Sequence, residues 1–137
     1  AHRRAKERLA VLKNPDVVMP DQVVDGKRTI KLGGTTLELV YTGRNHSDSS
    51  LVMFLPKEKI LFAVDFNSLG AVPSRLAIND SYPVEWEASL KKTLALDWER
   101  QIPGHPGPGG RMGTKDDVRA VKDYLTDLSN ATRDCCH

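Results

Sequence analysis

Apolar and polar residues follow one another along this chain in a pattern that predicts strands first and helices later. In residues 35–41, polar or branched positions alternate with leucine, leucine and tyrosine, which is the period of a half-buried strand. Two almost continuous apolar runs, 50–55 and 59–64, predict strands that are covered on both faces, joined by a tight hairpin turn at 56–59. Shorter strands are expected at 17–19, 28–32 and 100–102.

Apolar residues spaced three and four apart predict three helices. They cover residues 2–13, 83–95 and 114–129. Pro83 suits a first helical turn, and Thr114 suits a helix cap. The stretch 66–82 has no clear period and is expected to be a long loop, while 130–137 is expected to be a frayed tail. The order of the elements indicates a layered α+β or α/β arrangement over residues 1–137 as a single unit.

Composition and charge narrow the range of partners. The chain has 137 residues and a mass of 15.2 kDa, enough for one domain with a core. Lys and Arg total 20 against 18 for Asp and Glu, and the basic residues are scattered, so nucleic acid is not an expected partner. The apolar runs are much shorter than the about 20 residues that span a bilayer, so no membrane partner is expected. Cys135 and Cys136 form no disulfide framework, which favours a reducing, cytoplasmic location.

Three residues that can bind a metal follow predicted strands. His46 lies in the loop GRNHSDSS, Asp65 ends the apolar run ILFAVD, and His105 lies in IPGHPG. Taken singly, each is also compatible with a surface loop, a helix cap or a plain turn. A carboxylate at the end of an apolar strand is costly unless it is paired or binds a metal. Two imidazoles and a carboxylate at strand ends are a common ligand set for zinc or iron.

These motifs resemble the second half of the metallo-β-lactamase superfamily. In that family a histidine in G-x-x-H-[ST]-x-x-S, an aspartate in L-F-x-x-D and a histidine in P-G-H-x-G bind metal. GRNHSDSS, LFAVD and PGHPG match these motifs in the same order, and the resemblance runs from about Ala1 to the last predicted helix. It implies one half of an αββα sandwich, with one mixed, mainly antiparallel sheet and flanking helices.

The resemblance also implies a role for each residue. His46 corresponds to the third histidine of a first metal site, Asp65 to the carboxylate that bridges two metals, and His105 to the histidine of a second site. The implied cofactor is a pair of zinc ions, with iron as the alternative. His2 matches no ligand position and His137 lies in the tail, so neither is expected to bind metal.

Residues beside the three ligands are candidates for supporting roles. Asp48 and Ser49 can orient His46 or only form bonds within its loop, and the second interpretation is preferred. The loop 66–82 is expected to border the metals and to shape substrate choice through its larger side chains. These side chains are Phe66, Asn67, Leu69 and Tyr82.

The sequence contains no H-x-H-x-D-H cluster, the motif that supplies the other ligands in this family. The complete protein is therefore expected to be a metal-dependent hydrolase whose metal-activated water attacks an ester, thioester, lactam, lactone or phosphodiester in a small-molecule substrate. This chain alone is expected to be inactive, and to pair with the missing N-terminal half or with itself. The alternatives are a non-catalytic interaction module that self-associates or pairs with another chain, and an iron member of the superfamily with redox or sulfur chemistry.

Overall fold

A sheet and two long helices make up the part of the chain that the computed structural model describes, which is residues 13, 18, 21–73, 78–79 and 81–134. The predicted helix 2–13 and strand 17–19 fall almost entirely outside these residues. The elements are β1 (Lys27–Leu32), β2 (Thr35–Tyr41), β3 (Leu51–Leu55), β4 (Ile60–Phe62), α3 (Pro83–Ala95), β5 (Arg100–Ile102), a short 3₁₀ turn (Pro108–Gly110) and α4 (Lys115–Asp134).

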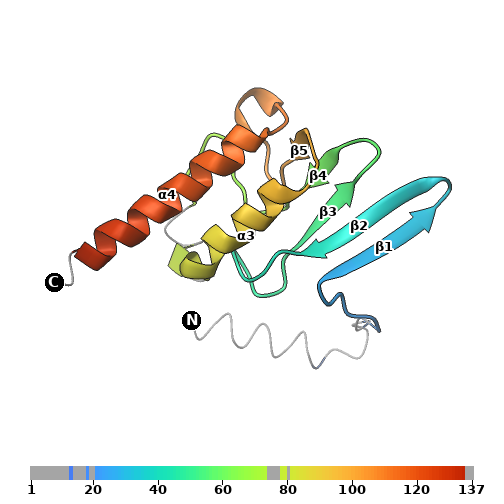
Figure 1. Ribbon diagram of the computed structural model, residues 1–137, viewed down its shortest axis with the longest axis horizontal. Helices are drawn as coiled ribbons and strands as arrows, with labels where there is room; N and C mark the ends of the chain where they lie inside the picture. Colours follow the sequence, from blue (N-terminus) through green and yellow to red (C-terminus); the bar gives the residue numbers. More distant parts are fainter. Residues whose placement is uncertain (1–12, 14–17, 19–20, 74–77, 80, 135–137) are drawn as a thin grey trace.

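The strands form one sheet in the order β1-β2-β3-β4-β5 (Figure 1). Neighbouring strands are antiparallel from β1 to β4, whereas β4 and β5 are parallel and are connected through α3. Gly33 and Gly34 join β1 to β2 with φ of 55° and 79°, values that favour glycine and that suit a two-residue hairpin turn. The sheet is therefore mixed and mainly antiparallel, which confirms the predicted fold class.

Strand β4 is shorter than predicted, Ile60–Phe62 rather than 59–64. The reason is that Lys59 and Val64 have φ of 53° and 48°, in the left-handed region, and so end the extended conformation on both sides. For a β-branched residue such as Val64 this conformation is strained. The strain lies immediately before Asp65, where the chain turns away from the sheet.

Both described helices cover the same face of the sheet. Trp86 and Leu90 of α3, and Val118 of α4, pack with the strand residues Val52 and Leu61 in one buried cluster. The spacing of Trp86, Leu90 and Leu94 predicts one buried apolar stripe on this helix, and the structure confirms it except that Leu94 is only partly buried. The other buried members are Phe54, Ala63, Phe66, Trp98, Val121 and Leu125.

Helix α4 extends to Asp134, further than the predicted end near residue 129, and residues 135–137 lie outside the described part. The added turn is supported by the Thr132 hydroxyl, which donates to the carbonyl oxygen of Leu128 at 3.0 Å. At the other end, the N–H and hydroxyl of Thr114 donate to Asp117 Oδ2 at 2.8 and 3.1 Å. Within the described residues, no helix has both the length and the apolar composition needed to cross a membrane.

The second face of the sheet is largely apolar, and neither α3 nor α4, the two long helices of the described residues, lies over it. In the strand register Ile30 pairs with Leu37, Leu39 with Met53, Met53 with Phe62, and Phe62 with Ile102, so all of these share one face. Ile30, Met53 and Ile102 are 41%, 38% and 42% exposed. On this face Met53 of β3 is exposed, whereas Leu55, Ile60 and Phe62 are partly buried, so the prediction that β3 and β4 are covered on both faces stays a prediction. We call this surface the open face: Ile30, Leu32, Leu37, Leu39, Met53, Leu55, Ile60, Phe62 and Ile102.

Candidate metal centre

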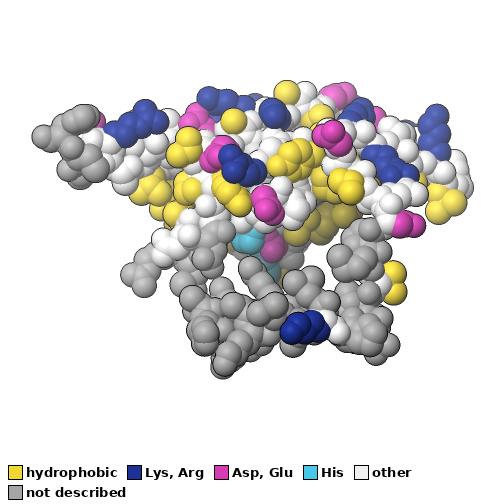
Figure 2. Space-filling view, turned by 90° about the horizontal axis from the view of Figure 1, so that it is seen from below, with side chains coloured by type: hydrophobic (Ala, Val, Ile, Leu, Met, Phe, Trp, Pro, Cys, Tyr) yellow, Lys and Arg dark blue, Asp and Glu magenta, His cyan; other side chains and the backbone are white. Residues whose placement is uncertain are grey.

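Three loops meet at one end of the sheet. Because β4 and β5 are parallel, the loops that follow them leave from the same end, and β3, antiparallel to β4, begins there. These loops carry His46, Asp65 and His105. The three side chains line one pocket of 250 Å³. Figure 2 shows histidine and acidic side chains lying together in a hollow of the surface.

Asp65 and His105 are in direct contact, with His105 Nε2 3.1 Å from Asp65 Oδ1. Gly104 makes this approach possible. Its N–H donates to the carbonyl oxygen of Val64 at 2.9 Å, and a Cβ at this position would lie 2.6 Å from Asp65 Oδ1. Any other residue at position 104 would therefore push the two loops apart.

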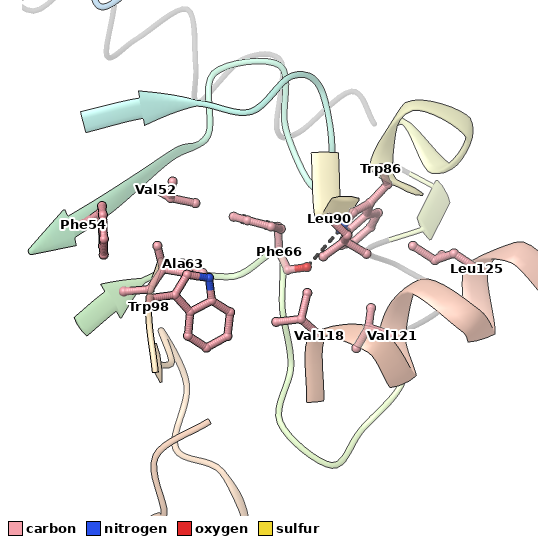
Figure 3. Packing of buried hydrophobic residues seen from close by; sticks show 11 residues of the cluster. Val52, Phe54, Ala63, Phe66, Trp86, Leu90, Trp98, Val118, Val121 and Leu125 are labelled. Carbon is pink, nitrogen blue, oxygen red and sulfur yellow. Dashed lines mark hydrogen bonds between the residues drawn. The ribbon is translucent and has the colours of Figure 1, made fainter. Parts of the chain in front are cut away.

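His46 lies on the other side of the pocket, against Trp86 of α3. The two ring centroids are 6.1 Å apart at an interplanar angle of 87°, an edge-to-face contact. The Trp86 indole N–H donates to the carbonyl oxygen of Phe66 at 2.9 Å (Figure 3). One side chain therefore contacts His46 and also fixes the loop that follows Asp65.

A buried amide holds the His46 loop against α3. Asn45 is fully buried, and its Nδ2 donates to the carbonyl oxygen of Gly43 at 3.1 Å and to Ser89 Oγ at 3.0 Å. The backbone carbonyl oxygen of Asn45 accepts the N–H of Tyr82 at 2.9 Å. Asn45 was not among the predicted site residues. The available signal was Ser89, a hydroxyl beside the apolar stripe of α3, which requires a polar partner when it is buried.

Asp48 and Ser49 form hydrogen bonds with residues at the end of β2 and in the loop that follows it. The carbonyl oxygen of Asp48 accepts the Tyr41 hydroxyl at 3.0 Å, and the N–H of Ser49 donates to Ser47 Oγ at 3.3 Å. Within the described residues neither side chain is bonded to His46. These contacts favour the structural interpretation of both residues.

The loop after Asp65 borders the candidate ligands with only some of the side chains that were expected, and with others besides. Ser68, Val72 and Pro73 line the pocket that holds the three candidate ligands. Phe66 is instead part of the buried core. The two other loop residues that were expected there, Asn67 and Leu69, line a smaller adjoining pocket of 160 Å³ together with Asp65 and His105. Tyr82 packs under the guanidinium of Arg44, with 4.8 Å between the ring centroid and Cζ.

The donor atoms suit zinc, although the set is incomplete. Imidazole nitrogen and carboxylate oxygen are both zinc donors, and the side chains of His105 and Asp65 are 81% and 39% exposed, so that an ion can reach them. In the described part of the chain no three His, Cys, Asp or Glu side chains converge on one ion. The assignment of His46, Asp65 and His105 as ligands stays a prediction.

Comparison with known proteins gives the following matches. The 2,4-dinitroanisole O-demethylase subunit alpha of Nocardioides sp. (strain JS1661) is 26% identical over 106 residues, which is 77% of this chain and 32% of that protein. The type 2 metallo-β-lactamase of Bacteroides fragilis is 26% identical over 119 residues, 85% of this chain and 48% of that enzyme. The solved structure of a metallo-β-lactamase from Pontibacter korlensis has a TM-score of 0.63 and 22% identity over 86% of this chain.

These matches cover only part of each relative. The chain spans 32% and 48% of the two curated relatives and 54% of the Pontibacter korlensis structure. No model of a protein family matches the chain.

Proposed function

The chain has the fold of the metallo-β-lactamase superfamily, and we propose that it forms the C-terminal half of a metal-dependent hydrolase. The observation that carries this proposal is the contact between Asp65 Oδ1 and His105 Nε2, 3.1 Å apart at the end of the sheet where His46 also lies. These loops are far apart in the sequence, and they bring together the donor types that zinc uses.

In this proposal His46, Asp65 and His105 would be this chain's ligands for a pair of zinc ions. When bound, such a pair lowers the pKa of a water molecule and polarises the bond under attack. The protein fixes the ligands: Trp86 supports His46, and Gly104 lets His105 approach Asp65. The Asp65 carboxylate also offsets the positive charge of the metals.

The substrate would be a small molecule with an ester, thioester, lactam, lactone or phosphodiester bond. It would enter the 250 Å³ pocket, whose wall includes the Ser68 hydroxyl and the apolar side chains of Val72 and Pro73. The two curated relatives are named for different reactions, an O-demethylation and the action of a β-lactamase, so the choice among substrates rests on assays.

We propose that the partner of the open face is the N-terminal half of the same hydrolase. The chain spans about half of its metallo-β-lactamase relatives, and one face of its sheet is apolar from β1 to β5. A second layer on this face would supply the missing metal ligands at the same sheet end. A second copy of this chain is the alternative occupant.

The test uses the full-length protein that contains this chain, purified and analysed for zinc by elemental mass spectrometry. Asp65→Ala is expected to lower the zinc content and to reduce kcat/KM at least about 100-fold, because a bridging ligand is lost. The assay would use a panel of chromogenic ester, thioester, β-lactam, lactone and phosphodiester substrates.

Asp48→Ala is the matched control, since its carboxylate lies in the His46 loop without a described bond to that histidine. It is expected to keep zinc and to retain kcat/KM within about threefold. Equal and small effects of the two substitutions, or an unsubstituted protein without bound metal, would contradict the proposal.

A further inference from the structure

A buried pair of amides lies directly behind the candidate metal centre. Asn67 Nδ2 donates to Gln101 Oε1 at 2.6 Å, and Gln101 Nε2 donates to the backbone carbonyl oxygen of Asn67 at 3.4 Å. The two residues are 1% and 0% exposed. Such a reciprocal bond between distant parts of the chain fixes their separation more tightly than apolar packing does.

The pair connects the loop of Asp65 to the strand that leads to His105. Asn67 follows Asp65 closely in the sequence, and Gln101 is the middle residue of β5, shortly before His105. Gln101 is itself held firmly, because its backbone N–H and carbonyl oxygen bond to Gly113 at 2.9 and 2.8 Å. The amide pair therefore ties the Asp65 loop to a rigid part of the sheet.

The loop that the pair holds is strained. Val64, immediately before Asp65, has φ of 48°, a conformation that a β-branched residue keeps only when its surroundings enforce it. The bond from Gly104 N–H to the Val64 carbonyl oxygen acts on the same turn from the His105 side. Without the amide pair, the turn would keep the bonds from Gly104 and Trp86 but lose its tie to β5, so the Asp65 carboxylate would be held less closely to its position.

Stability alone does not account for these amides. Asn67 Oδ1 is buried and has no hydrogen-bond partner among the described residues, which destabilises the folded state. Two apolar side chains of the same size would fill this space without that cost. A pair that leaves one oxygen unsatisfied is better explained by the geometry that its other bonds impose.

We propose that Asn67 and Gln101 are positioning residues that hold the Asp65 carboxylate beside the His105 imidazole. They act through the backbone of the Asp65 loop and do not themselves bind metal. The consequence for zinc affinity rests on the proposed function, whereas the placement of Asp65 against His105 is a property of the polypeptide.

The test uses the full-length protein and substitutions of nearly equal volume, Asn67→Leu and Gln101→Met. Each single variant leaves one amide without its partner, so its Tm should fall by several degrees. The double variant N67L/Q101M removes both side-chain amides and leaves neither without a partner, so its Tm should recover. Its zinc affinity, measured by competition with a chelator, should still be at least about tenfold weaker.

A second readout needs no metal. In the metal-free protein, the imidazole resonances of His105 report its contact with Asp65, and Asp65→Ala gives their position when the contact is absent. In the double variant they should move toward that position. Thr93→Val is the matched control, since it removes a buried hydroxyl that donates to the Ser89 carbonyl oxygen at 3.0 Å. It should lower Tm without changing the His105 resonances or zinc affinity.

A double variant with recovered Tm and unchanged His105 resonances would overturn the proposal. If Asn67→Leu alone does not fold, Gln101→Met and the double variant carry the test. If the unsubstituted protein takes up no zinc, the proposed function fails, and the His105 resonances still decide whether the amide pair positions Asp65.

Discussion

Asp117 shows how one side chain organises the segment between the His105 loop and α4. Both terminal nitrogens of Arg111 donate to its carboxylate, at 2.9 and 2.6 Å, and Thr114 donates two further bonds. The bond from Arg111 is the main reason that the pKa of Asp117 falls from 3.8 to about 2. Asp117 thus satisfies the N–H of Thr114 at the start of α4 and anchors the preceding turn.

We expect Asp117→Asn to lower the free energy of unfolding by about 1–2 kcal/mol at pH 7 through loss of these bonds. Because the folded-state pKa is below the ordinary value, the ionised carboxylate stabilises the fold above about pH 4, and this contribution disappears as the pH falls toward 2. Thermal unfolding of the full-length protein between pH 2 and pH 7 measures both effects. The neighbouring Asp116→Asn, at an exposed position, should change stability by less than about 0.5 kcal/mol.

At the scale of elements, α3 connects two of the loops that carry the candidate ligands. Trp86 contacts the His46 ring and bonds to Phe66, while Ser89, one helical turn further along, accepts the amide of Asn45. The helix therefore supports the candidate metal centre as well as the core. A shift of α3 would move the His46 and Asp65 loops together.

Trp86→Phe should separate these two roles. It removes the N–H that bonds to Phe66 but keeps an aromatic ring, so unfolding should become easier by about 1–3 kcal/mol. Trp98→Phe is a matched control, because Trp98 is equally buried and donates to the Thr93 carbonyl oxygen at 2.8 Å, outside the pocket lining. Both variants should lose similar stability in denaturant titrations, whereas only Trp86→Phe should weaken zinc binding. Equal zinc affinities would contradict the role assigned to α3.

At the scale of the whole molecule, the main feature is the open face of the sheet. Its alternating apolar residues meet no described helix, while the opposite face buries Val52 and Phe54 under α3 and α4. On the hairpin of β1 and β2 the pattern is reversed, with the Lys27 to Glu38 ion pair (2.8 Å) on the side of the helices and Ile30 and Leu37 on the open face. We expect an apolar surface of this kind to be covered by a partner.

The 137-residue chain purified alone is therefore expected to self-associate through the open face and to bind zinc weakly, since it supplies at most three ligands. Light scattering should give a mass above 15.2 kDa. Met53→Glu, in the centre of the face, should shift the population toward monomer. Val84→Glu is the control, because Val84 is 73% exposed on α3, away from the open face. A compact monomer that holds two zinc ions tightly and cleaves an ester would contradict this expectation.

Much of the fold could be predicted because local pattern and burial agree. Alternation in Thr35–Tyr41 places Leu37 and Leu39 together on the open face of the sheet. The helical stripe beginning at Trp86 places the apolar residues of α3 on the side that faces the core. The short glycine motif around His105 predicted a close approach of the backbone to another group. The structure shows that group to be the Asp65 carboxylate, which leaves room only for glycine at position 104. Candidate ligands and their strand-end positions are properties of the sequence by itself.

Only the tertiary structure decided how those candidates are held. The Asn67–Gln101 and Asn45–Ser89 bonds, and the contact of Trp86 with His46, join residues whose partners are not visible in any local window. Hydrogen bonding and edge-to-face contact depend on positions in space that a pattern of apolar and polar residues does not encode. The same holds for the left-handed turn at Val64, which goes against the local preference of valine and is enforced by its surroundings.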